Sequence, residues 1–286
     1  MSNYSKGVIL ALLSALSFAF LPIFIVFAYD GGVNAQTMLL IRFTTASILM
    51  FTYIYYKYGT IKVTKKALFG LFLLGVFGYT VQSRLYFTSI KYISPSMASM
   101  FLYTYPILVG ILSFLIDREK PTLNLFIATA ISFIGLVLIL GSSLGKANIV
   151  GILFVSAAAI VYSVYIVSSN KVIKKTPALL SSAYIALFSA IGSFILGSFS
   201  GGFDFSFQAS AWIPSLGIAV VSTVIAMVTF FKSMEYIGPT KTSIISLTEV
   251  FFTVVLSAII LHDFLSPIQM VGGACIISGA YLVAKA

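Results

Sequence analysis

Two stretches of this sequence decide the fold: YFTSIKYISPSMASMFLYTYPILVGILSFLI at residues 86–116 and FFKSMEYIGPTKTSIISLTEVFFTVVLSAII at residues 230–260. They align without a gap at a constant offset of 144 residues. Identical residues at equivalent positions include Phe87/Phe231, Tyr92/Tyr236, Pro95/Pro239, Thr104/Thr248 and Ser113/Ser257. The alignment indicates one unit written twice, and we expect the two copies to span residues 1–145 and 146–286.

The composition is that of an integral membrane protein. Hydrophobic residues make up 60% of the chain, charged residues only 8%, and the mean hydropathy is +1.09. A water-soluble domain has about a quarter of its residues charged. These values therefore exclude a soluble globular protein.

Ten apolar stretches are long enough to cross a hydrocarbon core as helices. Each is a continuous apolar run and lacks the alternation of barrel strands, so the predicted fold class is all-α with ten transmembrane helices. The expected spans are residues 8–28, 35–56, 67–90, 96–116, 122–140, 150–169, 178–199, 211–231, 242–261 and 268–284.

The basic residues predict the orientation in the membrane. With the N-terminus in the cytoplasm, thirteen of the 17 Lys and Arg residues lie on the cytoplasmic side, and the outer loops hold only Lys91 and Lys146. This bias is typical of inner loops. We therefore expect both termini inside, and the net charge of +10 is explained by topology without a nucleic-acid partner.

Five spans per copy is an odd number, so the second copy is expected to lie upside down relative to the first. The loop charges agree. The loop after the second span holds four Lys, whereas its counterpart after the seventh, SGGFDF, holds no basic residue. Inverted repeats give many secondary transporters two exchangeable conformations around a site near the membrane midplane.

The chain resembles the EamA type of the drug/metabolite transporter superfamily along essentially its whole length. The resemblance rests on SIKYISPSMAS and its second copy SMEYIGPTKTS, on LYTYPILVG followed by Glu119, and on SLTEVFF with Glu249. Val250 stands where the family often has Pro, and His262-Asp263 where Gly-Glu is common. The resemblance implies a plasma-membrane carrier, usually an exporter of amino acids or other small metabolites and sometimes an importer, which uses no ATP hydrolysis and no cofactor.

Three ionisable residues lie within predicted spans, which makes each a functional candidate because a charge in the bilayer is costly. Glu249 lies near the middle of its span, whereas Arg42 and Arg84 lie toward the outer side. Glu249 can bind a substrate ammonium group or carry protons; alternatively it is a helix-packing carboxylate. Its counterpart in the first copy is Tyr105, so we expect both to face the central axis.

Tyr79, Gln82 and Tyr86 share one helix face and are predicted to form a cavity wall, with a lipid-facing or packing role as the alternative. Arg84 is off that face by two positions and can instead extend toward the interface. For Arg42, the sequence favours an anchor to backbone carbonyls or headgroups.

Tyr103 and Tyr105 lie two residues apart in the fourth span and cannot both face one direction, so at most one is a good cavity candidate, and Tyr105 is preferred through its pairing with Glu249. Tyr162 shares a face with Tyr165 in the sixth span. Pro22 and Pro106 remove backbone donors and are expected to bend their helices. The predicted substrate-binding residues are Glu249, Tyr105, Tyr79, Gln82, Tyr86, Tyr162 and Arg84.

The substrate class depends on whether an arginine joins Glu249 in the cavity. A carboxylate with tyrosine rings suits an ammonium group, and an arginine suits a carboxylate, so both together suit a zwitterion. If the arginines are structural, a proton-coupled importer of an organic cation is the alternative. The chain has one His262 and one Cys275 and lacks motifs of intramembrane catalysis, so an enzyme, like a channel, is disfavoured, and no metal is expected.

Overall fold

A computed structural model describes residues 2–59, 62–89, 92–93, 95–118, 122–141, 148–199, 201–262 and 266–285. Apart from side chains of a few helical residues, the account below concerns these ranges. Lys91, Lys146, Glu119, Lys120 and Asp263, which entered the sequence predictions, lie outside the described residues.

The described part of the chain is built from helices and contains no strands. In the first half, the helices are α1 (Asn3–Ala19), α2 (Leu21–Asp30), α3 (Ala35–Tyr58), α4 (Lys65–Leu73), the π-helix η1 (Leu74–Thr80), α5 (Val81–Ser89), α6 (Pro95–Leu102), α7 (Tyr105–Asp117) and α8 (Leu123–Leu140). In the second half, they are α9 (Ile149–Ile173), α10 (Ala178–Ser198), the 3₁₀-helix η3 (Ala209–Ala211), α11 (Trp212–Ala219), the π-helix η4 (Val220–Ile225), α12 (Ala226–Ser246), α13 (Thr248–Ile260) and α14 (Pro267–Lys285).

Nine helical segments of the described chain are long and apolar enough to cross a membrane, and α13 is a shorter apolar helix. The predicted eighth and ninth spans are joined, because α12 continues through a kink at Gly238, whose φ is 80° and ψ 168°. The ninth span is therefore residues 239–246 of α12 followed by α13. A positive φ of this kind suits glycine, which carries no Cβ.

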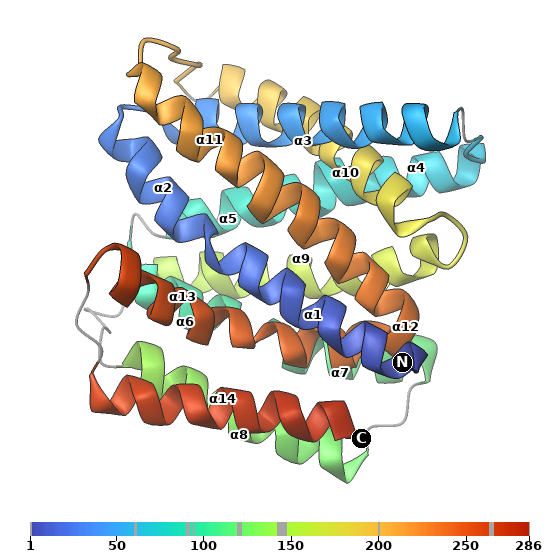
Figure 1. Cartoon of the computed structure of the whole chain (residues 1–286), viewed down its shortest axis with the longest axis vertical. Coiled ribbons are helices and arrows are strands. Elements are labelled where there is room, and N and C mark those ends of the chain that lie inside the picture. The colour runs from blue at the N-terminus through green and yellow to red at the C-terminus, as the bar shows by residue number, and fades with distance from the viewer. Residues whose placement is uncertain are drawn as a thin grey trace.

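The two halves pack against each other in matching pairs. The second and seventh spans, α3 and α10, lie side by side, and so do the fifth and tenth, α8 and α14 (Figure 1). The chain enters α3 at the edge where α2 ends and enters α10 at the opposite edge, so the second copy is inverted (Figure 1). Both termini lie toward one edge.

Close contacts repeat at the 144-residue offset. A Cβ on Gly7 would lie 2.5 Å from Ile237 Cγ2, and a Cβ on Gly151 would lie 2.8 Å from Ile93 Cγ2. Both contacts join the two halves: Gly7 of the first half packs on Ile237 of the second as Gly151 of the second packs on Ile93 of the first. The predicted all-α fold with two inverted repeats is confirmed.

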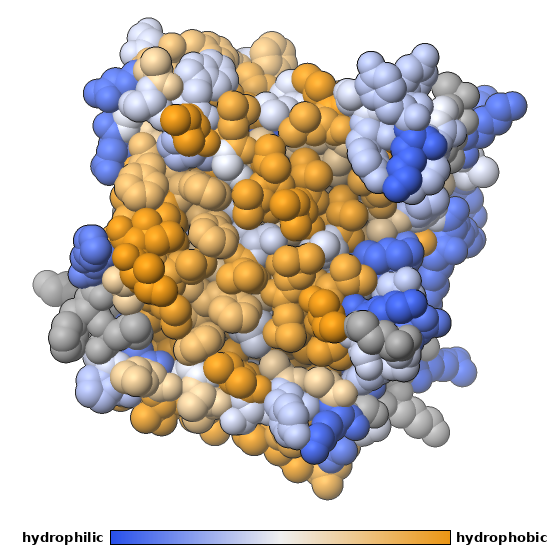
Figure 2. Space-filling model, viewed as in Figure 1, coloured by the Kyte–Doolittle hydropathy of each residue, from blue (hydrophilic) through white to orange (hydrophobic). Residues whose placement is uncertain are grey.

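The surface agrees with a membrane location. A broad apolar band covers the middle of the visible face, and hydrophilic side chains gather at its two edges, most heavily at the edge of the termini (Figure 2). Exposed apolar side chains such as Phe126, Phe69 and Leu153, which would be unfavourable in water, suit contact with lipid.

Candidate functional site

A cavity of about 600 Å³ lies between the two halves of the protein. Its walls come from α1, α2, α3, η1, α5, α6, α7, α8, α9, α11 and α13, and it extends to Tyr29 near the end of α2. That end lies at the edge opposite the termini (Figure 1). Six of the seven predicted site residues line it: Glu249, Tyr105, Tyr79, Gln82, Tyr86 and Tyr162.

Breaks in two equivalent helices bring Glu249 and Tyr105 into this cavity. The fourth span is interrupted, because α6 ends at Leu102 and α7 begins at Tyr105. The ninth span is interrupted at Leu247, so Glu249 lies in the first turn of α13. Unpaired backbone N–H groups at a helix start favour a negative charge. The helix start thus offsets part of the cost of placing the half-buried Glu249 carboxylate at this depth.

Arg42 is almost fully buried, with 6% exposure, and lines the same cavity. Its Nε donates to Thr223 Oγ1 at 2.7 Å, and its Nη2 donates to the Tyr79 hydroxyl and the Ser222 carbonyl, both at 3.2 Å. Tyr79 belongs to η1 and Thr223 to η4, and the two are equivalent at the 144-residue offset. Arg42 therefore connects the π-helical turns of both halves, and such turns often occur at functional sites.

The predicted anchoring of Arg42 to backbone carbonyls is present, through Ser222, but it is not the whole role of the side chain. The guanidinium group also faces the cavity, where its carbon lies 5.9 Å from the Tyr79 ring centroid. Within the described residues, its Nη1 makes no hydrogen bond.

A continuous chain of tyrosine rings runs from Arg42 to Glu249, and all of them except the core residue Tyr165 line the cavity. Successive ring centroids are 4.8 to 6.4 Å apart, within the range of favourable aromatic packing. The Tyr103 phenol, at one end of this chain of rings, interacts with the Glu249 carboxyl group. The order of the rings is Tyr79, Tyr165, Tyr162, Tyr105 and Tyr103.

The two charged groups of the cavity act on each other electrostatically but form no ion pair in the described structure. Arg42 is held by its neighbours on η1 and η4, and Glu249 by the first turn of α13. The cavity therefore presents a guanidinium group and a carboxyl group separately, with aromatic rings between them.

Arg84, which the sequence prediction included among the substrate-binding residues, is not among the residues that line the cavity, and its side chain is exposed. Its carbonyl oxygen accepts a hydrogen bond from Thr88 Oγ1 at 2.8 Å. The structure thus separates Arg84 from Gln82 and Tyr86, as their helical spacing indicated. The Tyr86 hydroxyl hydrogen-bonds Ser99 Oγ at 2.8 Å and ties α5 to α6.

The prediction that Tyr103 and Tyr105 cannot both face the cavity is wrong, because both line it. It assumed a continuous helix, whereas Tyr103 and Thr104 form a turn between α6 and α7. Pro106 was the available signal, since proline is favoured in the first turn of a helix. Pro22 likewise stands in the first turn of α2, which follows a break at Phe20.

The profile of the EamA-like transporter family matches residues 5–141 and, a second time, residues 149–285. These two matches cover nearly the whole chain. The chain belongs to the EamA-like transporter family. It is therefore a multi-pass membrane transporter and not an enzyme, as the sequence predicted.

Similar proteins carry the same general description. The chain is 26% identical over 279 residues to a protein of Bacillus subtilis named "Uncharacterized transporter YcbK", covering 94% of this chain and 89% of that one. A Haemophilus influenzae protein named "Uncharacterized transporter" is 25% identical over 297 residues, covering 97% and 94%. One solved crystal structure shares the fold, with a TM-score of 0.86, 18% identity and 97% of both chains covered.

Proposed function

We propose that this EamA-family protein is a secondary transporter of zwitterionic amino acids that works by alternating access and exports its substrate. The observation that carries the proposal is that Arg42 and Glu249 line one cavity with a wall of tyrosines between them. The volume of about 600 Å³ lies within the range of small-molecule sites.

The two charges suit the two ends of an amino acid. The free Nη1 of Arg42 can donate to the substrate carboxylate, for which a guanidinium group has matching geometry. Glu249 can accept from the substrate ammonium group, and the faces of Tyr105 and Tyr162 add cation–π attraction. The exchangeable carboxyl proton of Glu249 also supplies a means of coupling transport to protons.

The inverted repeat supports the alternating-access part of the proposal. Ser83, Tyr86 and Thr253 line the cavity, whereas their equivalents at the 144-residue offset are buried in the core. Those buried equivalents are Met227, Phe230 and Val109. If the repeats exchange conformations, the buried set separates on the side of the termini and the lining set closes.

Export and location follow from the same reasoning and belong to the proposal. The resemblance to EamA transporters implies export across the plasma membrane. The concentration of hydrophilic groups at the edge of the termini, with the Lys residues of the short loops, supports cytoplasmic termini (Figure 2). The cavity then opens to the outside, and residues 1–145 and 146–286 are the proposed repeat units.

The test is counterflow in proteoliposomes with three matched solutes: an amino acid, its methyl ester and its deaminated analogue. We expect exchange of the amino acid alone. Glu249→Gln should reduce exchange of the amino acid at least tenfold, because the ammonium group loses its charged partner. Arg42→Lys should weaken competition by the deaminated analogue, while Arg84→Gln, the matched arginine control outside the cavity, should leave exchange unchanged. Wild-type exchange and pH dependence in Glu249→Gln would refute the proposed site.

The hydrogen bonds of Arg42 to η1 and η4 favour a second candidate, in which Arg42 only holds helices together. The site then suits an organic cation, taken up in exchange for protons. In that case a quaternary ammonium ion should exchange, amino acids should not compete, and Arg42→Lys should be without effect on recognition.

A further inference from the structure

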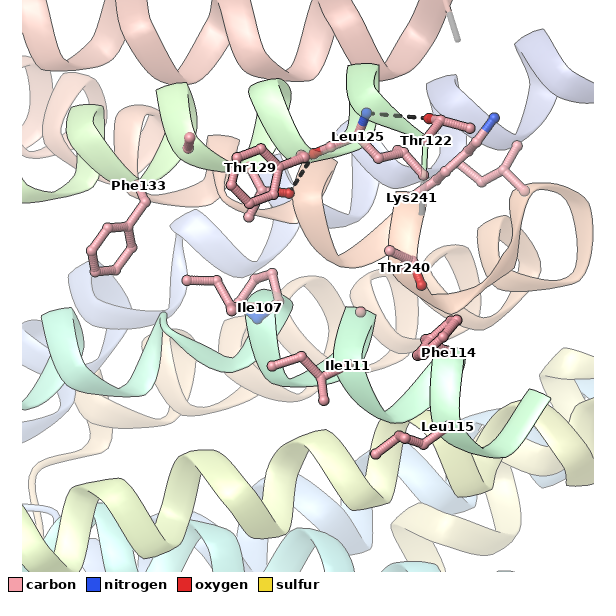
Figure 3. Close-up of a pocket in the computed structure, with 15 residues that line it drawn as sticks. Ile107, Ile111, Phe114, Leu115, Thr122, Leu125, Thr129, Phe133, Thr240 and Lys241 are labelled. Atoms are coloured by element: carbon pink, nitrogen blue, oxygen red, sulfur yellow. Dashed lines mark hydrogen bonds between the residues drawn. The ribbon is translucent and has the colours of Figure 1, made fainter. Parts of the chain in front are cut away.

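A second cavity, a lateral groove of about 940 Å³, lies between α7, α8 and α12. Figure 3 shows Ile107 and Ile111 on α7 facing Leu125 and Phe133 on α8, with Lys241 of α12 at one end. The groove is separate from the central cavity, since none of these residues lines the latter. It opens on the apolar surface that faces lipid.

The walls of this groove suit a hydrocarbon chain. The two threonines that α8 and its cap contribute are engaged within the helix: Thr129 Oγ1 donates to the Leu125 carbonyl at 2.7 Å, and Thr122 Oγ1 accepts from the Leu125 amide at 3.3 Å (Figure 3). The rest of the described wall is largely apolar. At membrane depth such a space is filled by lipid tails, because water finds no polar partners there.

One end of the groove is positively charged. Lys241 lines it near Thr122 (Figure 3). The Lys241 ammonium group donates to the Tyr4 hydroxyl at 3.4 Å and lies 4.6 Å from the Tyr4 ring centroid. This is the edge of the termini, and basic groups between helices at the cytoplasmic edge attract anionic lipid headgroups.

The equivalent position in the other half is closed. At the 144-residue offset, Thr129 and Ile107 of the groove correspond to Gly273 and Phe251. A Cβ on Gly273 would lie 2.3 Å from Phe251 Cδ2, so α13 and α14 are in tight contact where α7 and α8 are apart. In this conformation the groove is therefore present in one repeat only. The groove would close if the two repeats exchanged conformations.

We propose that the groove between α7 and α8 binds one anionic phospholipid, with an acyl chain along Ile107 and Phe133 and the phosphate at Lys241. Bound there, the lipid holds the conformation whose central cavity is open away from the termini. This second part rests on the proposed alternating access; the binding itself does not.

Lipid binding is tested by native mass spectrometry of the full chain with phosphatidylglycerol or phosphatidylcholine. We expect the wild-type protein to retain one phosphatidylglycerol molecule. Lys241→Gln should bind this lipid about fivefold more weakly, because the variant loses one basic group at the membrane surface. Lys66→Gln, at the start of α4, is the matched control and should bind normally. Gly110→Leu should abolish binding by filling the groove, since a Cβ there has open contact at 3.7 Å from Thr240. Equal retention of both lipids by wild type and Lys241→Gln would overturn the proposal. A dimer that Gly110→Leu dissociates would also overturn it, because a second copy of the chain would then occupy the groove.

The conformational part is tested with Thr253→Cys in a Cys275→Ala background, labelled by a maleimide that cannot cross the membrane. Phosphatidylglycerol should increase labelling from the side opposite the termini at least threefold, and Gly110→Leu should remove this effect. Retained lipid without a labelling change would refute the conformational part alone. Labelling that responds to neither lipid nor transported amino acid would instead count against alternating access.

Discussion

The crossing of α8 and α14 should tolerate no added methyl group, and Gly279→Ala tests this most sharply. A Cβ at this position would lie 2.0 Å from Ser132 Oγ and 2.7 Å from the Ala128 carbonyl oxygen. The serine hydroxyl can rotate away, but the backbone oxygen cannot. Reaching an ordinary contact of 3.4 Å therefore requires the helices to separate by about 0.7 Å. A gap of that size forfeits about a quarter to a half of the dispersion attraction along the contact.

Overpacking of this kind costs about 1 to 3 kcal/mol. Gly110→Ala is the matched control, because its Cβ would have only Thr240 Cγ2, at 3.7 Å, as a neighbour. There the substitution should gain up to about 1 kcal/mol from helix propensity. Because Gly279→Ala gains the same helix propensity, the two variants should differ by the overpacking cost alone. With about 2 to 4 °C per kcal/mol, the apparent Tm of Gly279→Ala should fall roughly 2 to 12 °C below that of Gly110→Ala.

The assay is thermal unfolding of both purified variants in the same detergent, followed by size-exclusion fluorescence. The equivalent contact of Gly135, whose Cβ would lie 2.4 Å from the Gly272 carbonyl oxygen, exists in the same conformation. Because both copies of the contact are present together, it should persist in both transport states, and the apparent substrate affinity of Gly279→Ala should stay unchanged. An apparent Tm equal to that of Gly110→Ala would refute the packing argument.

Three further predictions concern the breaks and the cavity. Gly238→Ala forces a side chain into φ 80° and should lower stability by about 1 to 3 kcal/mol. The measurement is apparent Tm against Gly141→Ala, because Gly141 has φ −63° and a Cβ there would lie 3.8 Å from Val137 Cγ1. Tyr103→Phe keeps the ring but removes the hydroxyl beside Glu249. Substrate affinity, measured by thermal-shift titration, should therefore change by up to tenfold while folding is unaffected. Unchanged affinity would contradict the contact between Tyr103 and Glu249. The cysteine of Met227→Cys should react with the maleimide from the side of the termini only when excess substrate on that side drives exchange. The cysteine of Ser83→Cys should react from the other side without substrate. Equal labelling from both sides would contradict alternating access.

Much of the candidate site follows from residue type and spacing. A carboxylate inside a span is rare because it is costly, so Glu249 stood out at once. The 144-residue offset then placed Tyr105 opposite it, and helical periodicity grouped Tyr79, Gln82 and Tyr86 on one face, although the predicted site also included Arg84. These arguments succeed because each depends on one helix or on the repeat.

Other members of the site depend on geometry that periodicity does not contain. Tyr103 enters the cavity through a turn that interrupts a helix, and Arg42 reaches both π-helical turns because α3 packs against α10 and η4. The relation of Arg42 to Thr223 joins residues that are 181 positions apart in the chain. Spacing within a helix gives no information about such pairs.

The sequence by itself determined the membrane class, the ten apolar segments and the duplication, because hydrophobic length and an exact register are properties of the chain alone. An odd number of spans in each repeat also determined the inversion. Only the tertiary structure decided on which side of the membrane the cavity is open. Equivalent residues such as Ser83 and Met227 have the same place in the repeat, but Ser83 lines the cavity and Met227 is buried in the core. The same holds for the groove between α7 and α8, because packing between helices is what distinguishes two halves with a common pattern.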